Sequence, residues 1–352
     1  MISLLKEVAR GKRGARDLSY EEAVRAAELI LGGSATSAQI GAFLVAERVK
    51  MESVEELQAF VDTLVSHAFR HPVSGGLDCA GPYDGRTKSF MATFPTAFVL
   101  GACGIPVTLH GSPSLPPKHG VTLYDLVHAF GIRMERQALI AGAAASGLLF
   151  VPTEDWCPPL ARLRPLREEL GLRTVFNSAE KLLRLSGSPF MALGVFHGTV
   201  FEKMAQLLTR LGISTGIVVQ GTEGSEDLPV DKRTRTLIVR DGVNELYIVD
   251  PEVLGLAVPS LSEAAAGDAK YGGTDSGVPW TVQRQMDISL AVLQGEADAP
   301  WTNAVILNSA VRLWVCGAVA SVEQGIEISM QALESGAAYR KFQRWIEAVR
   351  GA

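Results

Sequence analysis

Two loops with basic side chains are candidates for a ligand-binding site. The stretch LDCAGPYDGRTKSF, residues 77–90, has the pattern of a β-strand that enters a glycine-containing loop and then opens a helix. Positive side chains beside glycines, where a ligand can approach the backbone N–H groups closely, suit an anion such as phosphate. The alternative is an ordinary solvated basic loop. The residues concerned are Gly81, Gly85, Arg86 and Lys88 in this loop, and Lys118 and His119 in the later loop SPSLPPKHG.

A second group of positive charges forms the densest basic cluster in the chain. A groove lined by such residues would suit a polyanion, because phosphate contacts dominate nucleic-acid affinity. The alternative for each is a surface arginine beside acidic neighbours, as Glu168 and Glu169 are for Arg167. A net charge of −5 argues against a protein built to coat nucleic acid, although it leaves room for a local patch. The cluster consists of Arg162, Arg164, Arg167, Arg173, Lys181 and Arg184.

The cysteines and histidines give no sign of a metal centre or a nucleophile. Cys79, Cys103, Cys157 and Cys316 lie far apart, without a CxxC pair or a histidine at metal-ligand spacing. We expect buried free thiols in a reducing, cytoplasmic compartment. Cys157 has no nearby base in the sequence, and Trp156 is expected to pack in the core rather than to stack on a nucleic-acid base.

The first 70 residues are predicted to be helical. Three Ser/Thr-x-x-Glu/Gln capping boxes, which begin at Ser19, Thr36 and Ser53, each precede apolar residues at helical spacing. No window reaches the apolar length of a membrane span, and the charged N-terminus does not fit a signal peptide.

From about Gly76 onward, short β-rich runs alternate with helix-length segments. The runs are IPVTLH, GLLFV, FMALGVF, TGIVVQG, TRTLIV and ELYIV. This alternation predicts a mainly parallel sheet, whose ligand sites lie beyond the carboxyl ends of the strands. The loops CAGPYDGRTK and QGTEGSEDLPVDKRTRT both follow such strands, so we expect them to face one crevice. A last helical stretch, residues 304–336, carries a further capping signal at Ser321 and Gln324.

Four segments in unbroken order resemble the anthranilate phosphoribosyltransferase family (glycosyltransferase family 3). They begin LSYEEAVRAAELILGG, LREELGLRTVFN, GVFHGTVFEKMAQ and AVILNSAVRLWVCGAV, and the match runs from about residue 18 to residue 340. The resemblance implies a small all-helical domain at 1–75, completed by helices within about 160–186, and an α/β domain at 76–352 with a mainly parallel central sheet. It also implies a homodimer, and a reaction in which phosphoribosyl pyrophosphate loses pyrophosphate with help from Mg²⁺ while a nitrogen attacks the anomeric carbon.

The family's phosphate motifs are changed in this chain. Its G-T-G-G-D loop reads Gly81, Pro82, Tyr83, Asp84, Gly85, and its K-H-G-N-R motif has become Leu109, His110, Gly111, Ser112, Pro113. Pro82 removes a donor N–H, and Tyr83 adds a large side chain where close approach is needed. The string G-P-Y-D-G-R-T-K also resembles a divergent subfamily, some of whose members bind nucleic acid.

The family's acidic metal motif and acceptor arginine have counterparts. By resemblance, Glu223, Glu226 and Asp227 would hold Mg²⁺, whose preferred ligands are oxygens. The alternative is a solvated acidic turn before Pro229. Arg167 matches the arginine associated with the acceptor carboxylate.

Two hypotheses about function follow. The first is a glycosyl (pentosyl or phosphoribosyl) transferase with an altered phosphoribosyl pyrophosphate site and an unknown acceptor. The second is a non-catalytic paralogue that binds nucleic acid or a nucleotide in the same crevice. A phosphorylated sugar or nucleotide is the expected ligand of the first.

Overall fold

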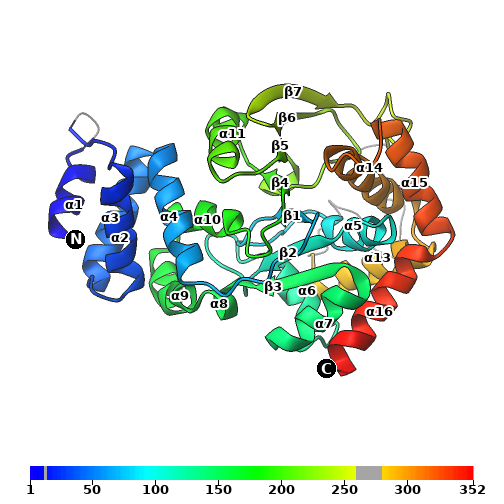
Figure 1. The fold of residues 1–352 in the computed structure, drawn as a ribbon, viewed down its shortest axis with the longest axis horizontal. Helices are drawn as coiled ribbons and strands as arrows, with labels where there is room; N and C mark the ends of the chain where they lie inside the picture. Colours follow the sequence, from blue (N-terminus) through cyan, green and yellow to red (C-terminus); the bar gives the residue numbers. More distant parts are fainter. Residues whose placement is uncertain (12–13, 259–279, 352) are drawn as a thin grey trace.

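The chain folds into a helical layer and a larger α/β part built on a single sheet (Figure 1). The computed structural model describes residues 1–11, 14–258 and 280–351. The fold class that the sequence predicts, a small all-helical unit joined to a mainly parallel α/β unit, is confirmed.

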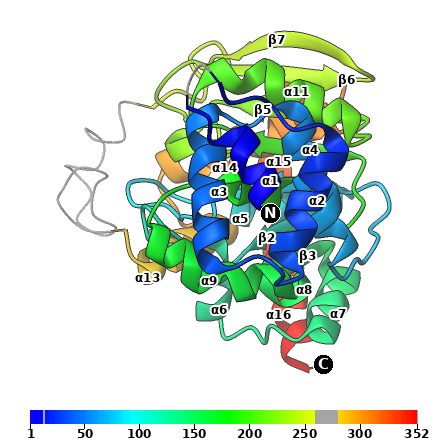
Figure 2. The same ribbon diagram turned by 90° about the vertical axis from the view of Figure 1, so that its left-hand side faces the viewer.

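The helical layer begins with four helices that the sequence marks clearly. The three predicted capping boxes are all present, because each cap side chain accepts from the N3 backbone N–H and each N3 side chain accepts from the cap N–H. Two later helices also pack against this group: α9 lies beside α2 and α3 (Figure 2), and α10 contacts α3 and α4. The elements are α1 (Ile2–Val8), α2 (Tyr20–Leu31), α3 (Ser37–Lys50), α4 (Val54–Ser66), α9 (Pro158–Leu170) and α10 (Val175–Ala179).

The sheet has seven strands in the order β3-β2-β1-β4-β5-β6-β7. Each β-rich run in the sequence forms a strand; β1 to β5 are parallel, and β6 and β7 form an antiparallel hairpin at one edge. After β3 the chain crosses β1 and adds β4 on its other side, which makes the β1–β4 junction the topological switch point where ligand crevices form. The strands are β1 (Leu77–Ala80), β2 (Val107–Gly111), β3 (Leu148–Pro152), β4 (Phe190–Gly194), β5 (Thr215–Val219), β6 (Thr234–Arg240) and β7 (Val243–Val249).

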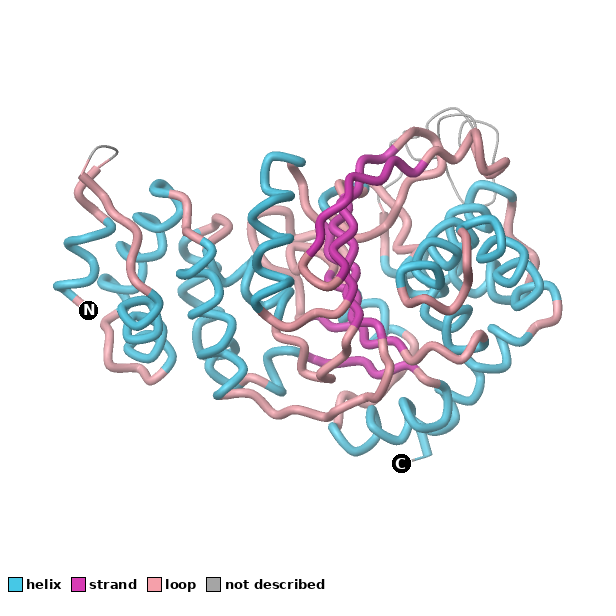
Figure 3. The backbone as a smooth tube through the Cα atoms, turned by 45° about the horizontal axis from the view of Figure 1, so that its top comes forward, coloured by secondary structure: helices cyan, strands magenta, loops and turns pink. Residues whose placement is uncertain are grey.

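The two faces of the sheet belong to two different cores, with helices on both sides (Figure 3). Because side chains alternate along a strand, Met191 and Leu193 face the helical layer while Ala192 faces the opposite side. Residues of α2, α3 and α4 share one buried cluster with the first face, so the helical layer and the sheet are packed as one body.

The second face is covered mainly by the C-terminal helices and α5. Ser321 caps α15 as predicted, but the Gln324 side chain accepts from the N–H of Ala320 rather than from that of Ser321, so the box is only half formed. The remaining helices are α5 (Thr93–Ala102), α6 (Leu123–Ala129), α7 (Arg136–Ser146), α8 (Thr153–Trp156), α11 (Phe201–Arg210), α13 (Val282–Gln294), α14 (Ala299–Val315), α15 (Val322–Glu334) and α16 (Ala337–Gly351).

The prediction of buried thiols is confirmed for Cys79 and Cys157, whereas Cys103 and Cys316 are only half-buried. All four cysteines are free, and burial raises the pKa of Cys157 to about 11, which does not suit a nucleophile. Trp156 is buried edge-on against Phe69 and is a core residue. Within the described ranges, no helix combines the length and hydropathy that crossing a bilayer would require.

The acidic loop after β5 is anchored to the C-terminal helices. Buried Asn308 of α14 accepts from the N–H of Leu228 at 2.9 Å and donates to its carbonyl at 3.0 Å. At the other end of the loop, a Cβ added to Gly221 would lie 2.2 Å from the carbonyl oxygen of Ser225. Both ends of the loop are therefore fixed.

Replacing Asn308 should destabilise the protein. Asn308→Leu leaves the buried N–H and C=O of Leu228 without partners, and we expect a loss of about 2–4 kcal/mol in the free energy of unfolding. Asn303→Ala on the same helix removes one partly buried hydrogen bond to Leu256 and should cost about 1 kcal/mol or less. Urea unfolding measures both, and equal losses would contradict the anchoring role.

Candidate functional site

A crevice of about 670 Å³ lies where the helical layer meets the carboxyl ends of β1, β4 and β5. Its walls come from the end of α3, the segment before and within α10, the loop after β4, the start of α11 and the tip of the acidic loop. It thus lies at the topological switch point. The lining includes Arg48, Glu52, Tyr83, Asp84, Arg173, Thr174, Asn177, Ser178, Lys181, Phe196, Thr199, Lys203, Glu223 and Gly224.

The crevice is rich in cations. Arg173 pairs with Asp84, Arg48 donates to the carbonyl of Arg173 at 2.8 Å, and Lys203 lies 3.6 Å from the Glu52 carboxylate. The Lys181 ammonium donates to the carbonyl of Gly194 at 3.1 Å. Burial lowers the pKa of Lys181 to about 8 and outweighs the opposing effect of Glu226 and Asp84.

Arg86, in the loop after β1, is buried rather than offered to a ligand. Its backbone forms a two-bond bridge with Val121, and its guanidinium donates to the Phe90 carbonyl at 2.6 Å and to Asp227 at 2.6 Å. Gly85, at a φ of +74°, packs so closely on Gly120 that an added Cβ would lie 2.2 Å from its carbonyl oxygen. This part of the loop positions Arg86 and lies against the acidic loop.

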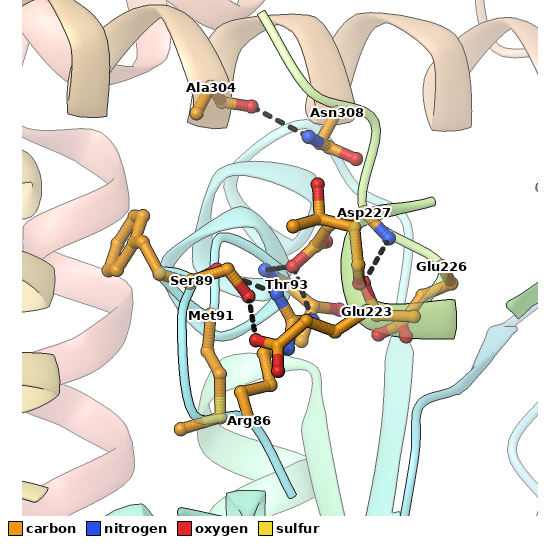
Figure 4. A network of polar contacts seen from close by, with 12 residues as sticks. Arg86, Ser89, Met91, Thr93, Glu223, Glu226, Asp227, Ala304 and Asn308 are labelled. Atoms are coloured by element: carbon orange, nitrogen blue, oxygen red, sulfur yellow. Dashed lines mark hydrogen bonds and ion pairs between the residues drawn. The ribbon is translucent and has the colours of Figure 1, made fainter. Parts of the chain in front are cut away.

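Glu223 crosses to the same loop and occupies its hydrogen-bond donors (Figure 4). Its carboxylate accepts from the N–H groups of Thr87 and Lys88, each at 3.0 Å, and from the Ser89 hydroxyl at 2.7 Å. Burial alone would raise the pKa of Glu223, but these hydrogen bonds outweigh it and the pKa is lowered. Glu223 is therefore a charged carboxylate held by these hydrogen bonds.

Asp227 is neutralised by two buried arginines. One carboxylate oxygen accepts from Arg86 and from the Thr93 N–H at 3.1 Å, and the other accepts from Arg312 of α14 at 2.9 Å. The Arg312 guanidinium also donates to the Thr93 hydroxyl. This cluster joins the two loops, α5 and α14.

The third carboxylate, Glu226, behaves differently. It is 1% exposed, and neither of its oxygens has a hydrogen-bond partner within the part of the chain that the structure describes. It lies under Gly81, where an added Cβ would approach its Oε2 to 3.0 Å. A side chain at position 81 would therefore press on the end of the Glu226 side chain.

The predicted magnesium ligands are thus in one loop but do not form a ligand set. The oxygens of Glu223 and Asp227 are already used by protein donors, which leaves only Glu226. Among residues 1–11, 14–258 and 280–351, no group of three or more His, Cys, Asp or Glu side chains is placed to hold a metal ion. The residues present do not fit Mg²⁺ in this arrangement.

The basic side chains at 162–184 bind separate groups of the protein. Arg164 pairs with Glu154 at 2.7 Å, Arg162 donates to the Leu31 carbonyl, and Arg184 donates to backbone carbonyls. Only Arg173 and Lys181 reach the crevice. The structure does not bring these residues into one basic row.

Arg167 is fully engaged by an acidic residue within the core. Its two terminal nitrogens each lie 2.8 Å from an oxygen of Glu180, and both side chains are 2% exposed. An internal ion pair, rather than an acceptor carboxylate, takes up this guanidinium.

The other expected anion-binding residues are divided between surface and interior. Lys88 and His119 are exposed, and Lys118 lies 3.4 Å from Asp84 and 3.8 Å from Glu223. Gly111 ends β2 beside the backbone of Tyr124. Of this group, Lys118 is the one held among the crevice's acids.

His110 belongs to a buried polar chain. Its Nε2 contacts Asp78 at 3.0 Å and its Nδ1 contacts the Tyr83 hydroxyl at 2.7 Å, which in turn lies 2.6 Å from the Thr153 hydroxyl. The Tyr83 ring is therefore held in the crevice wall by these hydrogen bonds.

Two crevice cations are not predicted as site residues from the sequence. Arg48 and Lys203 come from separate segments, and the fold brings them together with Arg173 and Lys181 of the predicted basic cluster. Phe196, 54% exposed at the crevice mouth, follows a buried strand without any motif. At the start of α10 the Asn177 side chain accepts from the Thr174 N–H at 2.9 Å, whereas the Thr174 hydroxyl has no hydrogen-bond partner among the described residues, so only half of a Thr174-x-x-Asn177 capping box is formed.

Comparison with known proteins identifies the family of this chain. The helical bundle domain model of the glycosyl transferase family matches residues 2–68, and its a/b domain model matches residues 84–339. An anthranilate phosphoribosyltransferase from Persephonella marina is 30% identical, with 99% of this chain and all of that protein aligned. The chain belongs to the anthranilate phosphoribosyltransferase family. A relative from Rhodospirillum rubrum is 32% identical over 98% of this chain and 95% of its own.

Solved structures of this family have the same fold. Anthranilate phosphoribosyltransferase from Thermus thermophilus superposes with a TM-score of 0.81 at 26% identity, covering 99% of both chains. The Saccharomyces cerevisiae enzyme in complex with PRPP and Mg superposes with a TM-score of 0.80 at 18% identity, covering all of this chain and 98% of its own.

Changes to the buried Arg167–Glu180 pair should act on stability. Arg167→Ala leaves the Glu180 carboxylate buried and unpaired, and we expect a loss of about 3–5 kcal/mol in the free energy of unfolding. The double change Arg167→Met with Glu180→Leu should recover most of this loss, whereas Arg162→Ala, at an exposed site, should cost about 1 kcal/mol or less. Denaturant unfolding of all three variants measures these values. A stable double variant that no longer binds any crevice ligand would show that Arg167 has a binding role instead.

Proposed function

We propose that this member of the anthranilate phosphoribosyltransferase family binds a phosphorylated pentose or a nucleotide in the crevice and is a pentosyl or phosphoribosyl transferase with an altered donor site. The observation that carries the proposal is the crevice itself, which lies at the switch point and contains Lys181, Arg173, Arg48 and Lys203. Lys181 stands out because its ammonium is buried beside the unpaired Glu226 and would gain a strong partner from an incoming phosphate.

The chemistry of such a transfer needs little covalent help from the protein. The bond between the anomeric carbon and pyrophosphate breaks while a nitrogen of the acceptor attacks that carbon, so positioning and charge stabilisation supply the catalysis. In this crevice Lys181 and Arg173 would hold the phosphate groups, and the polar side chains of α10 would orient the pentose. The acceptor is unassigned.

Anthranilate turnover is expected to be weak. By the family resemblance, Pro82 and the hydrogen-bonded Tyr83 would alter the backbone approach that the family's glycine loop provides, and Leu109 stands where the family has a lysine. Loss of one preorganised donor commonly lowers the rate by about a hundredfold. We therefore expect turnover of anthranilate at least about a hundredfold slower than that of the Persephonella marina relative, measured as pyrophosphate release, and equal rates would contradict the altered donor site.

A second candidate function rests on Phe196. Its ring is exposed in the crevice, the Arg173 guanidinium lies 6.0 Å from its centroid, and the His197 ring packs against it at 4.9 Å. An exposed ring beside a guanidinium is a suitable platform for a nucleobase, as in proteins that bind single-stranded nucleic acid. This supports a nucleotide or an oligonucleotide as the ligand.

Thermal stability with each ligand separates the two candidates. Phosphoribosyl pyrophosphate should raise the melting temperature if the transferase proposal holds, because a ligand that binds only the native state stabilises it. Stabilisation by a short single-stranded oligonucleotide, lost at high salt and in Phe196→Ala, would instead favour nucleic acid. No effect of phosphoribosyl pyrophosphate would argue against the donor site.

The affinity for a phosphorylated ligand should depend on pH. The Lys181 amine loses its charge as the pH rises through about 8, so affinity should be full below that value and fall above it. Phosphate is already dianionic there, since its second pKa is near 6. Lys181→Arg should bind without this decline because its guanidinium stays charged. Isothermal titration with phosphoribosyl pyrophosphate between pH 7 and 9.5 measures the effect, and a flat wild-type profile would exclude Lys181 as the contact.

A further inference from the structure

The loop segment Thr87–Ser89 has the arrangement of an anion-binding nest, and the ligand in it is the protein's own carboxylate. Two consecutive backbone N–H groups and two hydroxyls converge on Glu223, with donor–acceptor distances of 2.7 to 3.0 Å. The carboxylate oxygens stand where the oxygens of a phosphate group would receive the same hydrogen bonds.

Glu223 is placed so that it can leave. Its side chain lines the crevice and is 13% exposed, so the nest would open directly onto the cavity. The residue adopts a φ of +55°, a conformation that is uncommon for a residue with a side chain, and Gly224 follows at +77°. The loop on either side is anchored, which limits the displacement to the tip at residues 222–224.

Two guanidinium groups bind Asp227, one of the carboxylates that the family resemblance assigns to Mg²⁺. Arg86 and Arg312 contact different oxygens of the Asp227 carboxylate, at 2.6 and 2.9 Å, and both are buried. Together they carry the charge of a divalent ion. Arg86 is held there by its backbone bridge to Val121 and by the Phe90 carbonyl, so it is a fixed part of the fold.

We propose that Arg86 and Glu223 are internal substitutes for a divalent cation and a phosphate group, so that the crevice binds its phosphorylated ligand without Mg²⁺ and in competition with Glu223. This inference rests on the proposed function, because it concerns the same crevice. According to this inference, a phosphate group must displace the Glu223 carboxylate from the nest at 87–89. Ligand binding then requires no metal ion.

Isothermal titration with inorganic pyrophosphate tests the competition. Glu223→Ala vacates the nest and should raise the affinity for pyrophosphate by about tenfold or more relative to wild type. Glu223→Gln keeps the size of the side chain but turns an amide toward the donors, so its affinity should lie between the two. Glu202→Ala, at an exposed position on α11, is the matched control and should bind like wild type. Equal affinities in wild type, Glu223→Ala and Glu223→Gln would overturn the internal competitor.

The same titrations with EDTA and with added Mg²⁺ test the replaced cation. Wild-type affinity for phosphoribosyl pyrophosphate should be the same in EDTA and in Mg²⁺. Loss of binding in EDTA would overturn the proposal that Arg86 replaces the cation. If phosphoribosyl pyrophosphate binds wild type and Glu223→Ala equally well, the proposed function stands and the competitor fails. If neither protein binds phosphoribosyl pyrophosphate or pyrophosphate, both the inference and the proposed function fail.

A metal-rescue experiment gives an independent readout. Arg86→Ala removes one guanidinium and leaves Asp227 beside Glu226, so Mg²⁺ should raise the melting temperature of this variant by several degrees while leaving wild type unchanged. A variant that folds but does not respond to Mg²⁺ would overturn the assignment of Arg86 to the cation's place. If Arg86→Ala fails to fold, the EDTA comparison on the wild-type protein decides the question.

Discussion

The carboxylate of Asp227 is the interaction on which the rest of the site depends. A buried charge is costly unless it is paired and hydrogen-bonded, and this one is paired with Arg86 and Arg312 and accepts from the backbone at Thr93. Those partners come from the loop after β1, from α14 and from the start of α5. A single side chain therefore fixes the relative positions of the two loops that border the crevice, and it does so from a buried position.

The helical layer adds the opposite wall of the crevice through packing rather than through charge. Its core is continuous with one face of the sheet, and α9 and α10, which follow β3 in the chain, pack against its N-terminal helices. The residues at 173–181 consequently approach the strand ends from a surface that the N-terminal helices support. The cations of the crevice come from both sides of this junction, and Arg48 and Lys203 therefore lie outside the basic cluster that the sequence shows at 162–184.

The elements could be predicted from the sequence, but the pairing of charges could not. Capping residues and apolar periodicity act over three to eight residues, so Ser19, Thr36 and Ser53 and the strand runs indicate their own structure. Glu223, by contrast, finds its donors about 135 positions earlier in the chain, and Arg167 pairs with Glu180 instead of its sequence neighbours Glu168 and Glu169. Spacing in a motif shows which carboxylates share a loop, whereas the direction of each depends on contacts made by the whole fold.

The anchoring of the acidic loop has a consequence for how such a crevice can diverge. Asn308 and the close packing at Gly194 and Gly221 leave no room for the loop to shift as a unit, since an added Cβ at Gly194 would lie 2.1 Å from the carbonyl carbon of Ser225. Glu223, at the tip of the loop, lines the crevice and is held through its side chain, by the donors of residues 87–89. Substitution at this one position can therefore change the charge and shape of the crevice wall while the fold stays intact, which makes residue 223 the point where ligand preference is most open to evolutionary change.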